Sequence, residues 1–203
     1  MPRAKLRTPE LRDHVLSVAV DLLARDGVAG FTARRIATEA NTSTPAIYEL
    51  FGDKSGLVRE VFFEGFRLLR RQLDAVDRSD DPRADLLELL SRYRGFMREN
   101  PVLSDVMFSR PFTDFEPGPA ELDASGSVRI FIVELVSRCI EAGVLRGDPT
   151  DVAHVLVALV QGLAAAENAG RLGTSIESVD RRWALAVKAA IDGLSGQRSK
   201  GAS

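Results

Sequence analysis

The sequence predicts an all-α fold in which a small helical domain precedes a larger one. Apolar residues recur at helical spacing along nearly the whole chain, and no segment shows the period-two alternation typical of strands. Capping residues followed by proline mark helix starts, as in Thr8-Pro9 and Asp148-Pro149. At 203 residues the chain is long enough for one or two domains with a real core.

Four helices are expected in the first third of the chain. The first begins after Thr8 and stops at Gly27, where a left-handed residue suits a helix end. A second begins after Thr32 and stops at Asn41, because asparagine tolerates the left-handed conformation. The third begins at Ser43 or Thr44, and the fourth runs from about Lys54. The predicted domain boundary follows, with a first domain at 1–53 and a second domain at 54–203.

The second domain is expected to contain five more helices. They cover roughly 83–99, a short stretch after Pro101, roughly 120–142, the stretch from Asp148 to near Gly170, and a last helix capped by Ser175. Residues 77–85 form a loop by composition, and the segment from Pro111 to Pro119 is irregular. The tail after the last helix has the composition of a disordered end.

The second and third helices are too short to be stable alone. At about eight or nine residues each they need support, and the apolar stripe of the first helix supplies it. Two short helices joined by a tight turn match the helix-turn-helix plan, in which the later helix enters the major groove of DNA. The residues that we expect at this interface are Thr32, Arg34, Ser43, Thr44, Pro45, Ala46, Tyr48 and Lys54.

The chemistry of these residues suits contacts with DNA. Thr44 can donate and accept at a base edge, while Pro45 and Ala46 are small enough to meet a thymine methyl. The Tyr48 hydroxyl can reach a phosphate, and Lys54 adds an ammonium to the N–H groups at a helix start. Near the N-terminus, basic residues could follow the DNA backbone or the minor groove, namely Arg3, Lys5, Arg7 and Arg12.

The run FTARRIATEANTSTPAIYELFGDKSGL, residues 31–57, resembles the DNA-binding signature of TetR-type transcriptional regulators. The likeness covers about 50 residues, and the rest of the chain resembles the family only as a helical body of the expected size. The resemblance implies a transcriptional regulator with an N-terminal DNA-binding domain, which we call the reading head. The residues that match in register are Thr32, Ile36, Ala37, Ser43, Ile47, Tyr48, Phe51, Lys54 and Leu57.

Four positions depart from the pattern of that family. Asn41 stands where glycine is usual, and Thr42 stands where an inward valine is usual. Glu49 and Leu50 replace residues that are often basic or aromatic. An acid at position 49 would repel phosphate, or could accept a hydrogen bond from a cytosine amine. Core packing alone would also explain Tyr48, since aromatic residues at helical spacing are usually structural.

Composition excludes several other classes of function. The formal net charge is −2, so any DNA site must be a local patch. A single cysteine, Cys139, cannot form an internal disulfide, and the N-terminus has no apolar signal segment, so we expect a cytoplasmic protein. With two distant histidines, His14 and His154, the sequence shows neither a metal site nor a catalytic constellation, and we expect no cofactor and no enzyme activity.

A small-molecule effector site is expected in the second domain, where the resemblance implies a pocket between the middle helices. Such sites are concave and mostly apolar with a few polar groups. Arg94 and Arg110 are further polar candidates, Phe115 is a further apolar one, and ordinary core packing is the alternative for all of them. The candidate lining residues are Tyr93, Phe96, Met97, Phe108, Phe112, Phe131 and Glu134.

The last two helices are apolar around most of their circumference, so they are expected to be buried in the core or against a partner. The resemblance implies a homodimer that pairs through them as a four-helix bundle. A dimer would present two reading heads to a two-fold DNA operator. The candidate interface residues are His154, Ala158, Gln161, Gly162, Ala165, Val179, Trp183 and Val187.

These features predict a ligand-responsive repressor that binds a palindromic operator as a dimer and is released by a small molecule. The alternative is an all-helical interaction or adaptor module that uses its helix pair for protein contact. Binding to duplex DNA that weakens steeply with salt separates the two.

Overall fold

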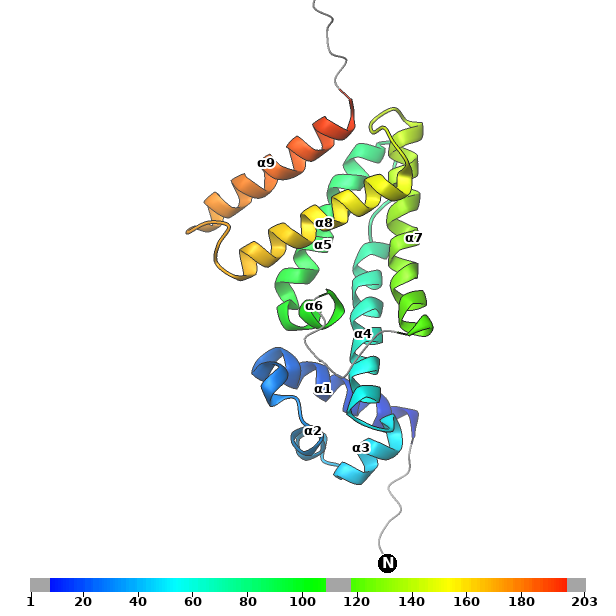
Figure 1. Cartoon of the computed structure of the whole chain (residues 1–203), viewed down its shortest axis with the longest axis vertical. Helices are drawn as coiled ribbons and strands as arrows, with labels where there is room; N and C mark the ends of the chain where they lie inside the picture. Colours follow the sequence, from blue (N-terminus) through cyan, green and yellow to red (C-terminus); the bar gives the residue numbers. More distant parts are fainter. Residues whose placement is uncertain (1–7, 109–117, 197–203) are drawn as a thin grey trace, which may run out of the picture. The chain divides into compact units, whose positions relative to one another are not determined.

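The computed structural model describes residues 8–108 and 118–196, and every regular element in these ranges is a helix (Figure 1). This confirms the predicted all-α fold. The tail after residue 196 and most of the segment from Pro111 to Pro119 lie outside the described residues. The described residues form two compact units, one of 8–68, 100–108 and 118–125 and one of 69–99 and 126–196.

The first unit contains the predicted helix pair. Its elements are α1 (Pro9–Gly30), α2 (Ala33–Glu39), α3 (Thr44–Phe51), the first part of α4 (Lys54–Asp74), α6 (Pro101–Phe108) and the start of α7 (Pro119–Glu141). Helix α1 packs against α2 and α6, and α2 packs against α3. Because α2 and α3 are short, this packing rather than helix propensity stabilises them. Buried side chains at the centre include Leu22, Ile36, Ile47, Phe51, Leu57 and Val61.

Gly27 has the left-handed backbone that the sequence predicts, with φ of 66°, but the helix resumes after it. The chain kinks at Gly27 and turns once more before α1 ends at Gly30. Gly30 is itself buried, and a Cβ there would lie 2.5 Å from the Asp26 Cβ and 2.8 Å from an Arg35 nitrogen. The end of α1 is therefore shaped to fit closely against the start of α2.

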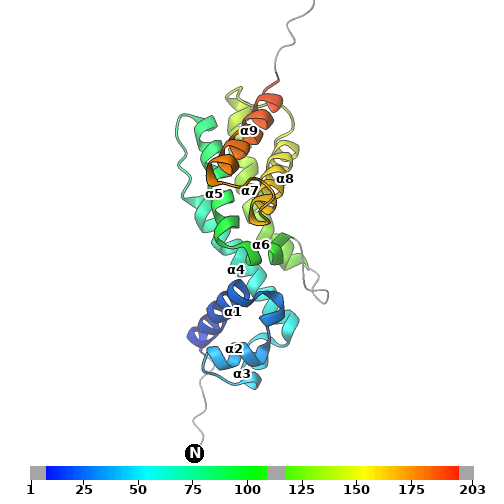
Figure 2. The same cartoon turned by 90° about the vertical axis from the view of Figure 1, so that its left-hand side faces the viewer.

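The second unit surrounds a separate apolar core. It contains the end of α4, α5 (Pro82–Glu99), most of α7, α8 (Pro149–Asn168) and α9 (Ile176–Leu194). Helix α8 packs against both α5 and α9, and the α8–α9 pair lies side by side in both views (Figures 1 and 2). The predicted caps of the last two helices are confirmed: Asp148 accepts the Thr150 and Asp151 N–H groups, and Ser175 forms a capping box with Ser178.

The predicted loop at 77–85 is wrong at its C-terminal end. Helix α5 begins at Pro82, because the Asp81 carboxylate accepts the N–H groups of Arg83 and Ala84 at 3.1 and 3.0 Å. Asp81-Pro82 is the same cap-and-proline pair that starts α8, so the sequence did carry this signal. Asp85, expected in the loop, lies in the first turn of α5 and is buried.

Within its own chain, α8 is not buried on most sides. Only 28% of its most apolar 18-residue window is buried, although by length and composition alone the helix could cross a membrane. Its inward face packs Val152, Leu156, Val160 and Ala164, while Val155 is 53% exposed. The sequence identified the apolar character of α8, but its own chain covers only one side of the helix.

Candidate nucleic-acid interface

Side-chain caps hold the α2–turn–α3 segment at both helix starts. Thr32 Oγ1 accepts the Arg35 N–H at 3.4 Å, and Ser43 Oγ accepts the Ala46 N–H at 3.3 Å. Between the helices Asn41 has a φ of 49°, the left-handed conformation predicted for it. Each capping hydroxyl acts as an acceptor here, so its own proton can still be donated, for example to a DNA phosphate.

Helix α3 has one buried face and one exposed face. Ile47 and Phe51 are buried, whereas the Tyr48 side chain is 46% exposed. About half of Tyr48 is covered by the protein, and the rest is accessible on the surface of α3. The exposed predicted residues are Thr32, Arg34, Ser43, Pro45, Tyr48 and Lys54, and the half-buried ones are Thr44 and Ala46.

A cluster of four charged side chains ties the kinked end of α1 to α2. Arg25 pairs with Glu39 at 2.7 Å and with Asp26, and Asp26 also pairs with Arg35. The hydrogen bond from Arg25 lowers the pKa of Asp26, and Arg35 lowers it further against the opposing effect of desolvation. Arg35 is thus engaged within the protein, while the neighbouring Arg34 has no ion pair among the described residues.

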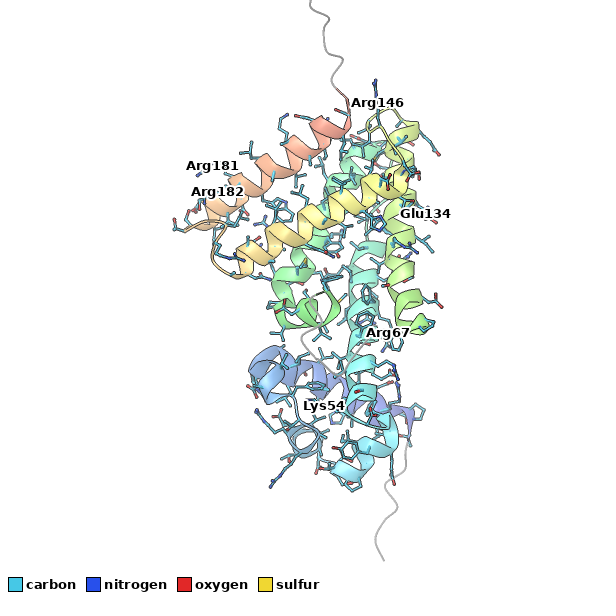
Figure 3. All side chains as sticks on the ribbon, in the orientation of Figure 1. Lys54, Arg67, Glu134, Arg146, Arg181 and Arg182 are labelled. Carbon is cyan, nitrogen blue, oxygen red and sulfur yellow. The ribbon has the colours of Figure 1, made fainter. Side chains whose placement is uncertain are left out.

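The start of α4 differs in one respect from the anion site that we expected around Lys54. Asp53 Oδ1 already accepts the Gly56 N–H at 2.7 Å, so a carboxylate takes one of the N–H groups at this helix end. Lys54 is exposed at the first position of the helix, as Figure 3 shows. One backbone N–H group of this helix start is therefore already bonded within the protein.

Of the basic N-terminal residues, only Arg12 lies within the described residues. Its guanidinium pairs with Glu60 of α4 at 2.6 Å and lies 5.3 Å from the centre of the Phe51 ring. Arg12 therefore joins α1 to α3 and α4. Arg3, Lys5 and Arg7 lie outside the described residues.

The candidate effector residues differ in their surroundings. Tyr93, Phe96, Met97 and Phe131 are buried in the second unit, and burial raises the pKa of Tyr93 although Gln161 donates to its hydroxyl at 2.8 Å. Glu134 is exposed and pairs with Arg78 at 2.9 Å. Phe108 is half-buried in the first unit, and Phe112, Phe115 and Arg110 lie outside the described residues.

Arg94, a candidate polar anchor, joins three helices of the second unit. It makes two hydrogen bonds to Glu167 of α8, at 2.8 and 3.0 Å, and one to Asp180 of α9 at 2.7 Å. Its guanidinium also lies 4.7 Å from the centre of the Trp183 ring. The hydrogen bond to Glu167 is the main cause of the raised pKa of Arg94. These contacts fix α9 against α5 and α8.

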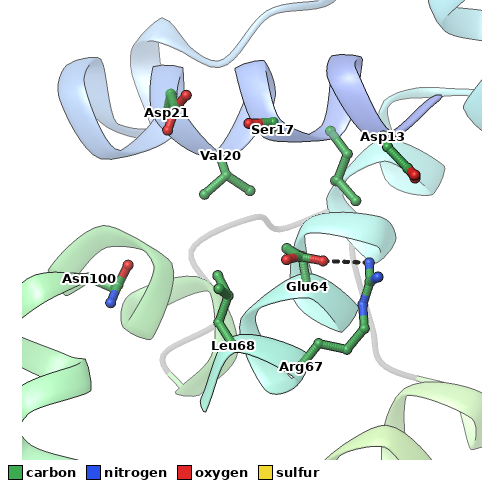
Figure 4. A pocket seen from close by; sticks show the side chains of 9 residues that line it. Asp13, Ser17, Val20, Asp21, Glu64, Arg67, Leu68 and Asn100 are labelled. Carbon is green, nitrogen blue, oxygen red and sulfur yellow. Dashed lines mark ion pairs between the residues drawn. The ribbon is translucent and has the colours of Figure 1, made fainter. Parts of the chain in front are cut away.

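A cavity of about 410 Å³ lies in the first unit, outside every predicted site (Figure 4). Asp13, Ser17 and Asp21 of α1 line one side, and an ion pair between Glu64 and Arg67 of α4 at 2.5 Å lines another. Acidic groups outnumber basic ones, so the cavity does not suit an anion. In the described part of the chain, no three His, Cys, Asp or Glu side chains are grouped so that they could hold a metal ion.

The candidate dimer residues divide into an outward and an inward set. His154, Ala158, Gly162 and Ala165 are exposed along α8. Two residues of α9 instead face their own chain, because Trp183 and Val187 are buried. Between these sets, Val179 and Gln161 are half-buried, and Gln161 bonds to Tyr93. Leu185 of α9, which the sequence analysis did not name, is 66% exposed.

Comparison with known protein families decides the family of the chain. Residues 15–61, which contain α2 and α3, match the family model described as bacterial regulatory proteins of the tetR family. Residues 86–190, just over half of the chain, match the model described as the tetracyclin repressor-like C-terminal domain. The chain belongs to the TetR family. It is therefore a DNA-binding transcriptional regulator, as the sequence predicts, and regulators of the TetR family are typically not enzymes.

Individual proteins and solved structures are also similar to this chain. A nicotine-responsive transcriptional repressor, HdnoR of Paenarthrobacter nicotinovorans, is 32% identical over 81 residues, which cover 39% of this chain and 42% of that protein. A Rhodococcus sp. RHA1 protein of unknown function has a TM-score of 0.77 at 26% identity over 97% of this chain and 100% of its own. A TetR-like regulator from the same organism has a TM-score of 0.67 at 23% identity, with coverage of 97% and 100%.

Proposed function

We propose that this TetR-family regulator is a repressor that binds a palindromic operator as a homodimer and is released by a small-molecule effector. The observation that carries the DNA-binding part is the exposed face of α3, which the buried Ile47 and Phe51 orient outward. We assign the reading head to residues 1–53, with Lys54 at its border. The DNA-contacting residues are proposed to be Thr32, Arg34, Ser43, Thr44, Pro45, Ala46, Tyr48 and Lys54.

Different residues of this surface have different tasks. The hydroxyls of Thr32, Ser43 and Tyr48 and the cations of Arg34 and Lys54 contact phosphates, which sets position and affinity. Thr44, Pro45 and Ala46, at the start of α3, lie against base edges and set sequence preference. Changes in the first group weaken binding to all sequences alike, whereas changes in the second alter which sequence is preferred.

The homodimer is supported by the uncovered side of α8. Small residues line it, with Ala158, Gly162 and Ala165 exposed, and helices with such residues can approach closely. Val155 and Leu185 add two large exposed apolar side chains to the same helix pair. Pairing through α8 and α9 would bury these groups and bring two reading heads to one operator.

An effector site in the second unit is supported by its aromatic side chains and by the small-molecule response in the name of the HdnoR relative. We propose that Tyr93, Phe96, Met97 and Phe131 move apart to admit an apolar ligand, with the Tyr93–Gln161 hydrogen bond as its polar partner. Helix α4 belongs to both units, so it is the element through which binding changes the spacing of the two heads. The ligand can change the balance between the DNA-binding and the released conformation only by as much as its affinities for these two conformations differ.

The proposal is tested by selecting bound fragments from a random duplex library with the purified protein. We expect an inverted repeat whose half-sites are about 34–36 Å apart, with affinity that falls steeply as salt rises. Binding that is independent of salt, or no enrichment of any sequence, would identify the chain as a helical adaptor instead. Small molecules are then screened for release of the selected operator, and operator affinity that stays constant with every bound ligand would rule out the switch.

A further inference from the structure

Glu49 is the residue of α3 that points most directly away from the protein. Successive residues of an α-helix are rotated by about 100°, so Glu49 lies about 200° from Ile47 and about 160° from Phe51. Ile47 and Phe51 are the two buried residues of this helix, and Glu49 is exposed. Pro45 precedes Glu49 by four residues and shares its outward ridge.

This position faces bases rather than phosphates when α3 lies in a major groove. The outward ridge of a recognition helix meets the floor of the groove, where the base edges are, and its flanks meet the phosphate walls. Tyr48 lies about 100° from Ile47 and is therefore on a flank. Glu49 is thus held on the floor side, away from the phosphates that would repel it.

A carboxylate discriminates among the four bases in the major groove. It only accepts hydrogen bonds, and cytosine presents an N4 amine donor to it. Guanine presents two acceptors and thymine presents one acceptor and a methyl, so both are disfavoured. Adenine has an N6 amine that could donate to one carboxylate oxygen. Its N7 acceptor lies beside that amine and would repel the other carboxylate oxygen, so adenine is also disfavoured.

We propose that Glu49 determines operator specificity by accepting a hydrogen bond from the N4 amine of a cytosine in each half-site. The inference rests on the proposed entry of α3 into the major groove. Helix α3 itself carries no cationic side chain. Base recognition by this helix therefore relies on Glu49 and on the small residues at its start, Thr44, Pro45 and Ala46. The carboxylate costs some general affinity for DNA and adds preference at one base pair.

Library selection with wild type, Glu49→Gln and Glu49→Ala tests this role. Glutamine pairs with adenine N6 and N7, so Glu49→Gln should move the preference at one position per half-site from cytosine to adenine. Glu49→Ala should lose the preference at that position only. We expect roughly tenfold discrimination against other bases in the wild type, a typical size for one base contact. Because Glu49 is exposed, each substitution should change the free energy of unfolding by no more than about 0.5 kcal/mol.

Asp21→Asn is the matched control, since it removes one exposed carboxylate from α1 of the same unit. It should leave every base preference unchanged. If Glu49→Gln strengthens binding to all sequences alike and selects the same bases as wild type, Glu49 is only a source of repulsion and the inference is wrong. If the wild type enriches no sequence at all, the proposed function has failed first, so the two failures are distinguishable.

Discussion

Single residues of the reading head carry separable properties, and Tyr48 shows this most directly. Tyr48 is 46% exposed, so Tyr48→Phe should remove the proposed phosphate contact without opening the core. Because a hydrogen bond to a charged group contributes about 1.5–3 kcal/mol, we expect at least tenfold weaker binding to every duplex. Titration of labelled operator and of scrambled duplex measures it. A loss confined to the operator would instead make Tyr48 a base reader.

Lys54→Ala should act on the salt dependence as well as on affinity. A plot of log K against log salt concentration has a negative slope, and removing one phosphate-contacting cation makes this slope less steep by about 1. The measurement is the same titration repeated across a series of salt concentrations. Lys188→Ala is the matched control, because Lys188 is an exposed lysine of α9 that pairs with Asp192. An equal change of slope in both variants would show that Lys54 acts only through net charge.

Thr42 is expected to destabilise the reading head. Its Oγ1 is buried without a hydrogen-bond partner among the described residues. A buried unsatisfied hydroxyl costs about 1 kcal/mol or more, and valine has nearly the same shape, so Thr42→Val should stabilise the protein by about 1 kcal/mol. This corresponds to roughly 3 °C in melting temperature for a chain of this size. Thr174→Val, at an exposed position, should change little, and a lower melting temperature for Thr42→Val would contradict the assignment.

At the scale of helices, the sequence predicted what depends on near neighbours along the chain. Thr32, Ser43, Asp148 and Ser175 cap helices through bonds to residues two or three positions ahead. The caps at Thr32, Asp148 and Ser175 were predicted, and Ser43 was expected as one of two possible starts of α3. The direction of a face was harder to predict. The stripe that contains Trp183 and Val187 has the same pattern whether its own chain or a partner covers it, and here its own chain covers it.

Contacts between distant residues could not be predicted, and Asp85 is the clearest case. Its carboxylate accepts a hydrogen bond from Arg138, 53 residues away, at 2.8 Å, and others from Ser79. These bonds attach the loop before α5 to α7. No local pattern marks such a pair, because the two residues meet only after the second unit has folded.

Asp85 should make the second unit sensitive to acid. Burial alone would raise the pKa of Asp85, but the hydrogen bonds from Ser79 and Arg138 outweigh it, and the pKa lies below its ordinary value. A carboxylate with a lowered pKa in the folded state stabilises the fold above its unfolded pKa of about 3.9, and this contribution is lost as the pH falls toward the folded value. We expect Asp85→Asn to lower the free energy of unfolding at pH 7 by about 2 kcal/mol, since it removes the carboxylate that pairs with the half-buried Arg138.

Urea unfolding at pH 7 and pH 3 measures this difference. The difference in free energy of unfolding between wild type and Asp85→Asn should be smaller at pH 3, where the wild-type carboxylate begins to be protonated and stabilises the fold less. Asp80→Asn removes an exposed acid from the same loop and should match wild type at both pH values. An equal effect of Asp85→Asn at both pH values would show that packing rather than charge stabilises this loop.

For the whole molecule, the proposed dimer predicts that two exposed positions matter to DNA binding although both lie outside the reading head. Ala158 and Leu185 are exposed on α8 and α9, so a carboxylate at either position is tolerated by the isolated chain. In the dimer the same carboxylates would be buried without partners, a cost of several kcal/mol for each copy. Ala158→Asp and Leu185→Asp should therefore yield folded monomers in sedimentation equilibrium at concentrations where the wild type is dimeric.

Because these variants dimerise less, their affinity for the full operator should also fall. A monomer binds one half-site only and loses the increase in affinity that comes from linking two binding events. Affinity for a single half-site should stay at the level of a wild-type head. Leu87→Asp is the matched control, since Leu87 is an exposed apolar residue of α5, outside the proposed surface. If Leu87→Asp dissociates the protein and Leu185→Asp does not, the subunits pair through another face, and the spacing of the two recognition helices must be derived from that face instead.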